Sequence, residues 1–173
     1  MSAARPDRAT SGGSAIVRVA IAALGLAALV VPAGGQAQYQ REIGNDPARC
    51  AAGPAVRITV TDIKSSAGKV RVQLYRGTKQ DWLESGRWLN RIEVPARAGT
   101  MSFCMPAPEA GTYAIAVRHD INGNGKTDLS QDGGGMSNNP SINIFNLGKP
   151  SYTKTRFELG NEVKTISIRM RYM

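Results

Sequence analysis

The sequence predicts an all-β fold, an antiparallel sandwich or barrel of about seven short strands. Several stretches after residue 54 alternate apolar and polar residues, turn residues rich in Gly, Pro and Ser separate them, and no long helical period occurs there. Period-two alternation is typical of strands with one buried face. Short strands separated by turn signals pack as two sheets or close on themselves.

The first 37 residues are predicted to be a Sec-type signal peptide that precedes this fold. Arg18 and two earlier arginines lead into the apolar run 19–31, and small residues then place cleavage near Ala37. An uncleaved membrane anchor is disfavoured, because the run has about 13 residues and a spanning helix needs roughly 20. The protein is therefore expected to be periplasmic or secreted, with the signal peptide as its only contact with the membrane.

Residues 38–54 form a polar arm in front of the predicted domain, residues 55–173. Cys50 and Cys104 are the two cysteines of the chain. In an oxidising compartment an even number of cysteines usually pairs, so a disulfide is predicted, which would close a loop of about 55 residues. A reactive thiol is the alternative, but neither cysteine has a base nearby in the sequence.

The first strands are expected from residue 55 and again over 69–75. The two runs flank a short Gly-containing turn, which predicts an antiparallel hairpin. Residues 77–97 fit a helical turn followed by a strand, with core packing favoured over a ligand groove for Trp82 and Trp88. The inward positions of the hairpin are Val56, Ile58, Val60, Val70, Val72 and Leu74.

Later strands follow the same alternation. In the stretch 101–105, Cys104 takes the face opposite Met101, Phe103 and Met105. The clearest central strand is 111–118, in which large side chains alternate with alanines. The chain closes with strands over 157–159 and 163–172. The expected inward residues of these strands are Tyr113, Ile115, Val117, Ile166, Ile168, Met170 and Tyr172.

A motif that follows the central strand fits the start of a calcium loop, D-x-[DN]-x-[DN]-G. Alternate oxygen-bearing side chains surround a hard cation in such loops, and Gly125 permits the sharp turn. Gln131 replaces the usual bidentate Glu, so this ligand is missing unless Asp132 supplies it, and any Ca²⁺ site is expected to be weak. A metal-free turn held by Asx hydrogen bonds accounts for the same residues. The predicted ligands are Asp120, Asn122, Asn124, Lys126 and Asp128.

His119 is the only histidine of the chain and precedes this loop directly. Paired with Asp120, it could serve as an acid-base residue of a metal-assisted hydrolase. A lone histidine is more often structural, and no nucleophile stands out beside it. The Gly- and Asn-rich segment 133–149 is typical of binding loops and lids.

The chain carries 22 Lys and Arg against 13 Asp and Glu, a net charge of +9. This excess favours an anionic envelope partner, such as lipid head groups or acidic polysaccharide. Export and the scattered basic residues argue against nucleic acid. A basic surface without any partner accounts for the charge equally well.

Four blocks in order, Gly111–Lys126, Met136–Asn139, Gly148–Tyr152 and Phe157, resemble the bacterial domain of unknown function family 2141. The likeness covers about residues 55–173. It implies an exported sandwich of the immunoglobulin-like or transthyretin-like type and no established activity.

The leading functional hypothesis is a non-enzymatic periplasmic or envelope module that binds a ligand or partner through loops 120–150. A structural envelope protein without a small ligand and the hydrolase with His119 and Asp120 are the alternatives. Catalytic residues and an organic cofactor are not predicted.

Overall fold

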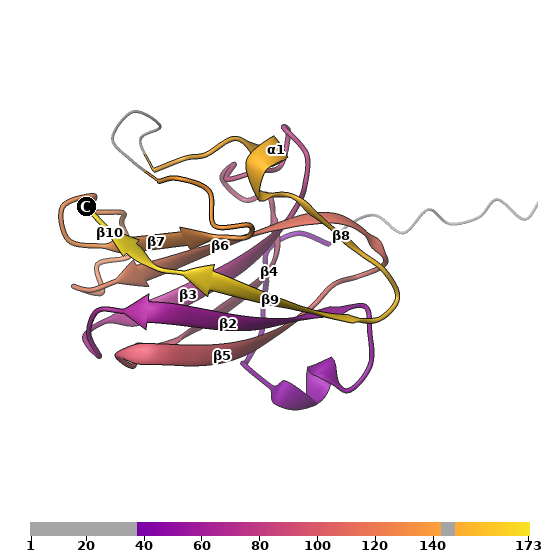
Figure 1. Ribbon diagram of the computed structural model, residues 1–173, viewed down its shortest axis with the longest axis horizontal. Coiled ribbons are helices and arrows are strands. Elements are labelled where there is room, and N and C mark those ends of the chain that lie inside the picture. The colour runs from indigo at the N-terminus through magenta and orange to yellow at the C-terminus, as the bar shows by residue number, and fades with distance from the viewer. Residues whose placement is uncertain (1–37, 143–147) are drawn as a thin grey trace, which may run out of the picture. The chain divides into compact units, whose positions relative to one another are not determined.

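The computed structural model describes residues 38–142 and 148–173, so the predicted signal peptide lies outside the described residues (Figure 1). No helix in the described part of the chain is long and apolar enough to cross a membrane. The elements in chain order are β1 (Arg41–Glu42), η1 (Pro47–Cys50), β2 (Ala55–Ile63), β3 (Lys69–Arg76), β4 (Trp88–Pro95), β5 (Gly99–Pro106), β6 (Gly111–Asp120), β7 (Gly133–Met136), α1 (Tyr152–Thr155), β8 (Phe157–Leu159), β9 (Val163–Arg169) and β10 (Arg171–Tyr172).

The strands form two sheets, which confirms the predicted all-β sandwich. The larger sheet has the order β1-β4-β3-β6-β7-β10, with β8 also paired to β6, and the smaller sheet has the order β5-β2-β9. Figure 1 shows β2, β5 and β9 as the layer that faces β3 and β6. The sheets are mixed, and not purely antiparallel as predicted, because β2 pairs with β9 in parallel and β1 pairs with β4 in parallel.

The predicted hairpin of β2 and β3 is wrong, because the two strands lie in different sheets. β2 pairs with β5 and β9, whereas β3 pairs with β4 and β6. The turn between them crosses from one layer to the other. Alternation in a sequence identifies the buried face of each strand, but both faces of a sandwich core give the same pattern, so it does not identify the partner strand.

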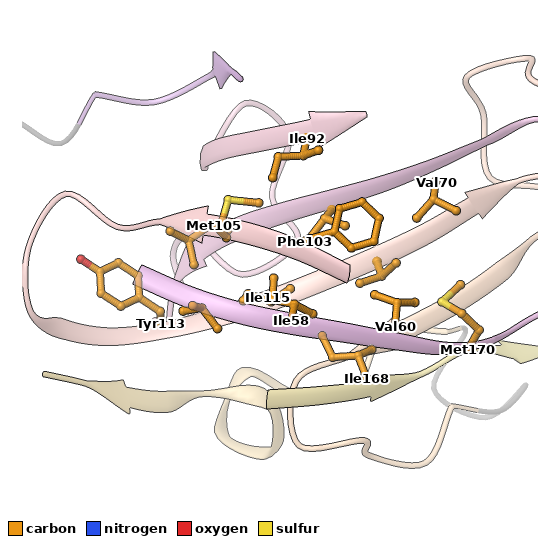
Figure 2. Close-up of a cluster of buried hydrophobic side chains, with 14 of the residues drawn as sticks. Ile58, Val60, Val70, Ile92, Phe103, Met105, Tyr113, Ile115, Ile168 and Met170 are labelled. Carbon is orange, nitrogen blue, oxygen red and sulfur yellow. The ribbon is translucent and has the colours of Figure 1, made fainter. Parts of the chain in front are cut away.

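The hydrophobic core fills the space between the two sheets (Figure 2). The expected inward residues of β2, β3 and β6 are buried there, as are Phe103 and Met105 of β5, whereas Met101 is partly buried. Cys104 lies on the opposite face of β5 as predicted. The side chains with essentially no exposed surface include Ile58, Val60, Val70, Leu74, Ile92, Met105, Tyr113, Ile115 and Ile168.

A second apolar cluster lies on the outer face of the larger sheet, where the small side chains of Ala114 and Ala116 leave room for it. Trp82 and Trp88 are buried there, which confirms that both belong to a core. Tyr75 packs edge-on against Trp82 with ring centroids 5.5 Å apart. The Trp82 indole N–H donates to the Pro150 carbonyl, so this cluster ties the segment after β7 to the sheet.

Part of the predicted Gly-rich loop is a strand. β7 pairs with β6 on one side and with β10 on the other. A side chain at Gly133 would collide with the Tyr172 ring, and one at Gly135 would lie 2.8 Å from Ile168. The glycines therefore permit close packing of the C-terminal strands, although glycine is uncommon in strand interiors.

The N-terminal arm is fastened to the sandwich at two places. β1 covers the edge of β4, and a disulfide joins Cys50 of η1 to Cys104 of β5, with their Cα atoms 5.7 Å apart. The Asn45 side chain accepts from the Cys104 amide and donates to the Ser102 carbonyl, so it occupies backbone groups of β5.

Candidate functional site

The predicted calcium loop begins where β6 ends, and the strand geometry separates its first residue from the neighbouring histidine. Successive side chains of a strand point to opposite faces. His119 points into the space between the sheets, and Asp120 points to the outer face of the larger sheet beside Arg118. The structure therefore does not bring His119 and Asp120 together as an acid-base pair.

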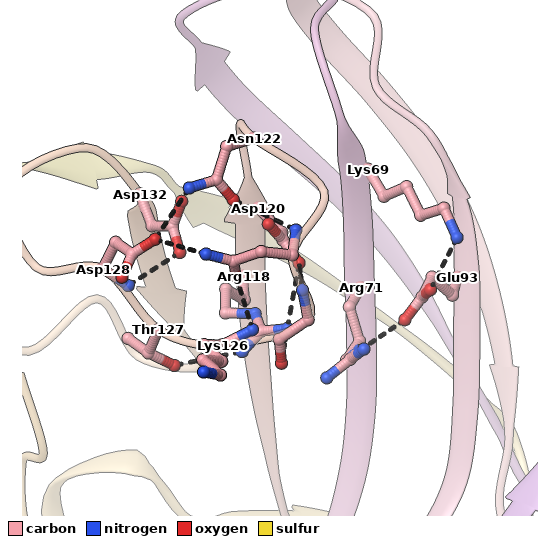
Figure 3. Close-up of polar contacts among 12 residues, drawn as sticks. Lys69, Arg71, Glu93, Arg118, Asp120, Asn122, Lys126, Thr127, Asp128 and Asp132 are labelled. Atoms are coloured by element: carbon pink, nitrogen blue, oxygen red, sulfur yellow. Dashed lines mark hydrogen bonds and ion pairs between the residues drawn. The ribbon is translucent and has the colours of Figure 1, made fainter.

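The loop side chains converge on Asp128 (Figure 3). Its Oδ2 atom accepts from the side-chain amides of Asn122, at 2.8 Å, and of Asn124, at 2.7 Å. These two donors hold the pKa of Asp128 below its ordinary value. The Asn122 and Asn124 side-chain oxygens accept from backbone amides two residues ahead, which is the Asx-turn pattern.

Asp132 stabilises the same loop from its far end, a role that the sequence did not assign. One carboxylate oxygen accepts from the Ile121 amide and the other from the Asp128 amide, at 3.1 and 2.9 Å. Lys126 contributes its amide to Asn124, and no contact of its carbonyl singles it out as a ligand. Of the five predicted ligands, four side chains therefore take part in one network.

Asp120 is the member of the loop with an unused oxygen. Its side chain is buried, and its Oδ2 atom accepts from the Gly125 amide at 2.8 Å and pairs with Arg118 at 3.3 Å. Its Oδ1 atom is buried and has no hydrogen-bond partner among the described residues. A buried carboxylate oxygen without a donor or cation is costly, so this atom is the point at which the loop can accept a further ligand.

Arg118 holds the loop against the sheet. Its guanidinium donates to the Thr127 hydroxyl at 3.1 Å and to the Gly125 carbonyl at 3.0 Å, in addition to the Asp120 carboxylate (Figure 3). No group of three or more His, Cys, Asp or Glu side chains in the described residues is arranged to hold a metal ion. A cation in this loop would therefore depend on amide and carbonyl oxygens as well as carboxylates, which favours weak affinity.

A groove of about 550 Å³ lies on the outer face of the larger sheet and shares no lining residue with this loop. Of its lining residues, only Trp88 is considered for a ligand groove from the sequence, and core packing is favoured for it. It lies where the parallel pairing of β1 with β4 brings Gln40 and Glu42 beside the sheet. The Arg91 guanidinium covers the Trp88 ring at 4.0 Å and pairs with Glu42 at 3.1 Å. The lining residues are Gln40, Glu42, Gln73, Tyr75, Leu83, Glu84, Ser85, Gly86, Trp88 and Arg91.

Residues 58–167 match the model of the family described as "Uncharacterized protein conserved in bacteria (DUF2141)". The chain belongs to this family. Neither a curated protein nor a solved structure matches the chain. The matched range contains the loop and the strands that form the floor of the groove, while β1 lies before it. Membership confirms the resemblance found in the sequence, and the family description names neither a fold nor an activity.

Proposed function

We propose that the protein is an exported, non-enzymatic binding module of the bacterial envelope, in which a calcium ion orders the loop 120–132. The observation that carries the proposal is the buried, unpartnered Oδ1 atom of Asp120 at the head of that loop. A divalent cation would satisfy this oxygen, and the loop supplies further oxygens at the alternate positions that hard cations require.

The hydrogen bonds of the loop also support a cation site. The Gly125 amide already donates to Asp120, which fixes the sharp turn and orients the carboxylate. Asp128 is ionised at neutral pH, as an ordinary aspartate is, and its two amide donors lower its pKa further. Rotation of the Asn122 and Asn124 side-chain amides would turn their oxygens, in place of their N–H donors, toward the cation in the loop.

The position of the only histidine favours binding over catalysis. His119 has no exposed surface, and both of its ring nitrogens are within hydrogen-bond distance of protein oxygens. A general base must reach a substrate proton directly or through one water. Buried in this way, His119 serves the fold instead.

Export is supported by the basic and apolar start of the chain and by the disulfide, which persists in oxidising compartments. We expect the protein from the periplasmic fraction to begin at Gln38, as measured by N-terminal sequencing and intact mass. Ala37→Trp should block processing, because the cleavage site requires a small residue. Recovery of the unprocessed wild-type chain in the membrane fraction would instead indicate an anchor.

Calcium should raise the thermal unfolding midpoint of the oxidised protein relative to EDTA. For a dissociation constant of about 1 mM, about 10 mM calcium stabilises the native state by roughly 1.4 kcal/mol. That stabilisation corresponds to a rise of several degrees for a domain of this size. Differential scanning calorimetry over a calcium series would measure it.

Asp120→Asn tests the site and Asp62→Asn is its matched control. Asn at position 120 keeps an acceptor for the Gly125 amide but removes the charge, so the calcium-dependent rise should disappear. Asp62 forms an exposed pair with Arg169 at 3.3 Å, remote in sequence from the loop, and its substitution should leave the rise intact. An equal rise in both variants, or none in the wild type, would refute calcium binding by this loop.

A further inference from the structure

Two buried aromatic residues of the groove have unused polar atoms. Tyr75 is 4% exposed and Trp88 is 6% exposed. Neither the Tyr75 hydroxyl nor the Trp88 indole N–H has a hydrogen-bond partner in the described part of the chain, and neither atom is itself buried, so both are open to the groove. Buried tyrosine and tryptophan side chains usually find such partners. Elsewhere in this protein they do, since Trp82 donates to Pro150 and Tyr113 donates to Glu109.

The backbone around the groove is held in unfavourable conformations. Gln40 has φ 63° and Leu83 has φ 57°, both in the left-handed region that residues with side chains rarely adopt. The Gln40 amide donates to the Trp88 carbonyl at 2.8 Å, which fixes the arm beside the sheet. Backbone strain of this kind is concentrated at ligand clamps and active sites.

We infer that this groove binds neutral, polyhydroxylated ligands, namely the sugar units of an uncharged envelope glycan. The Gln40 and Gln73 side chains can donate and accept hydrogen bonds, and the Glu84 carboxylate accepts them. The Tyr75 hydroxyl and the Trp88 indole N–H add two solvent-accessible groups without a partner among the described residues. Sugar hydroxyls are both donors and acceptors, so they complement such a mixed lining. The groove volume is within the range of small-molecule sites.

The charges of the lining residues favour a neutral ligand over the anionic partners that the net charge of the chain suggests. Glu42 and Glu84 are acidic, and Arg91, the basic residue of the lining, is already paired with Glu42. A phosphate or uronic acid would meet the Glu84 carboxylate there, although Arg71 and Arg118 also act on the neighbouring Tyr75. An extended peptide could not pair with β4 at this point, because β1 occupies that edge.

Ring stacking contributes little to this recognition, since Arg91 covers one face of Trp88. Specificity is therefore expected to come from hydrogen bonds to hydroxyl groups. Burial raises the pKa of Tyr75 to about 12, so its hydroxyl stays protonated and able to donate. The groove and the loop 120–132 share no residue, so a failure of calcium binding would leave this inference standing.

Proton–nitrogen correlation NMR of the oxidised protein can test this inference directly, because the chain contains two tryptophans with different environments. Short neutral oligosaccharides of hexose and N-acetylhexosamine units are the probes, added to about 10 mM to detect dissociation constants in the millimolar range. The Trp88 indole resonance, assigned with Trp88→Phe, should shift and saturate. The Trp82 resonance should stay in place, because its N–H already donates to Pro150.

Tyr75→Phe separates binding from stability. Loss of the hydroxyl should weaken the best oligosaccharide about tenfold, the effect of about one hydrogen bond. The midpoint of thermal unfolding should be unchanged or higher, because the hydroxyl has no partner in the protein. Tyr113→Phe is the matched control: it removes the hydrogen bond to Glu109, so it should lower the midpoint and leave affinity unchanged.

Two results would overturn the inference. The first is an unmoved Trp88 resonance with every neutral oligosaccharide. The second is an equal shift with an acidic oligosaccharide of uronic acid units, which would show that hydroxyl recognition does not select the ligand. Unchanged affinity in Tyr75→Phe would equally contradict the role given to its hydroxyl.

Discussion

Replacement of both Cys50 and Cys104 by serine is expected to lower the free energy of unfolding by about 4 kcal/mol. The disulfide joins residues 54 positions apart, and in the chain-entropy model a crosslink over such a loop restricts the unfolded chain by about that amount. A small domain has a total stability of about 5–15 kcal/mol, so the loss is a large fraction. Urea unfolding followed by tryptophan fluorescence would measure it.

The same experiment contains its own controls. Reduction of the wild type should reproduce the instability of the double variant, and a reductant should leave the double variant unchanged. Asn45 should keep the arm beside β5 in the folded state of both, because its side chain binds the Ser102 carbonyl and the Cys104 amide. A loss below about 1 kcal/mol would mean that the bridge adds little beyond these contacts.

The buried faces of the strands could be predicted from the sequence, whereas their pairing could not. Tyr113, Ile115 and Val117 of β6 face the core as the alternation predicts. β2 was assigned to the wrong neighbour, because its actual partners, β5 and β9, lie far along the chain. Close packing against Tyr172 and Ile168 explains two of the three glycines of β7, Gly133 and Gly135, and the sequence carries no sign of those contacts.

The two candidate sites likewise differ in how far the sequence could predict them. The loop is a local feature, so the spacing of Asp120, Asn122 and Asn124 was enough to find it. Asp132 was missed as a stabilising residue, because its role depends on backbone amides at both ends of the loop. The groove arises from the parallel pairing of β1 with β4, which no local pattern reveals. The sequence therefore favours core packing over a ligand groove for Trp88 and does not single out Tyr75.

A series of hydrogen bonds around His119 connects the turn between β2 and β3 with the C-terminal strand β10. The His119 Nε2 atom lies 2.8 Å from the Ala67 carbonyl, which can only accept, so this nitrogen carries the proton. Nδ1 then accepts from the Tyr172 hydroxyl at 2.7 Å, and that hydroxyl accepts from the Lys64 amide at 2.9 Å. With a neutral imidazole, each polar group in this series of hydrogen bonds has a partner.

His119→Ala is therefore expected to destabilise the protein by about 3–5 kcal/mol, the range for truncating a large buried ring. The truncation also leaves the Ala67 carbonyl and the Tyr172 hydroxyl without this partner, which adds to the cost. Tyr172→Phe keeps the ring volume and removes one hydroxyl, so it should cost only about 1–3 kcal/mol. Equilibrium urea unfolding of the oxidised variants would measure both losses.

The comparison of the two variants decides whether His119 is structural. If His119 is structural, the His119→Ala variant loses binding or turnover only in proportion to its unfolded fraction. At low temperature, where the variant regains its fold, its function should return. A catalytic histidine would abolish turnover in fully folded protein. Because no nucleophile contacts the imidazole and its two nitrogens bind Tyr172 and Ala67, we expect the first result.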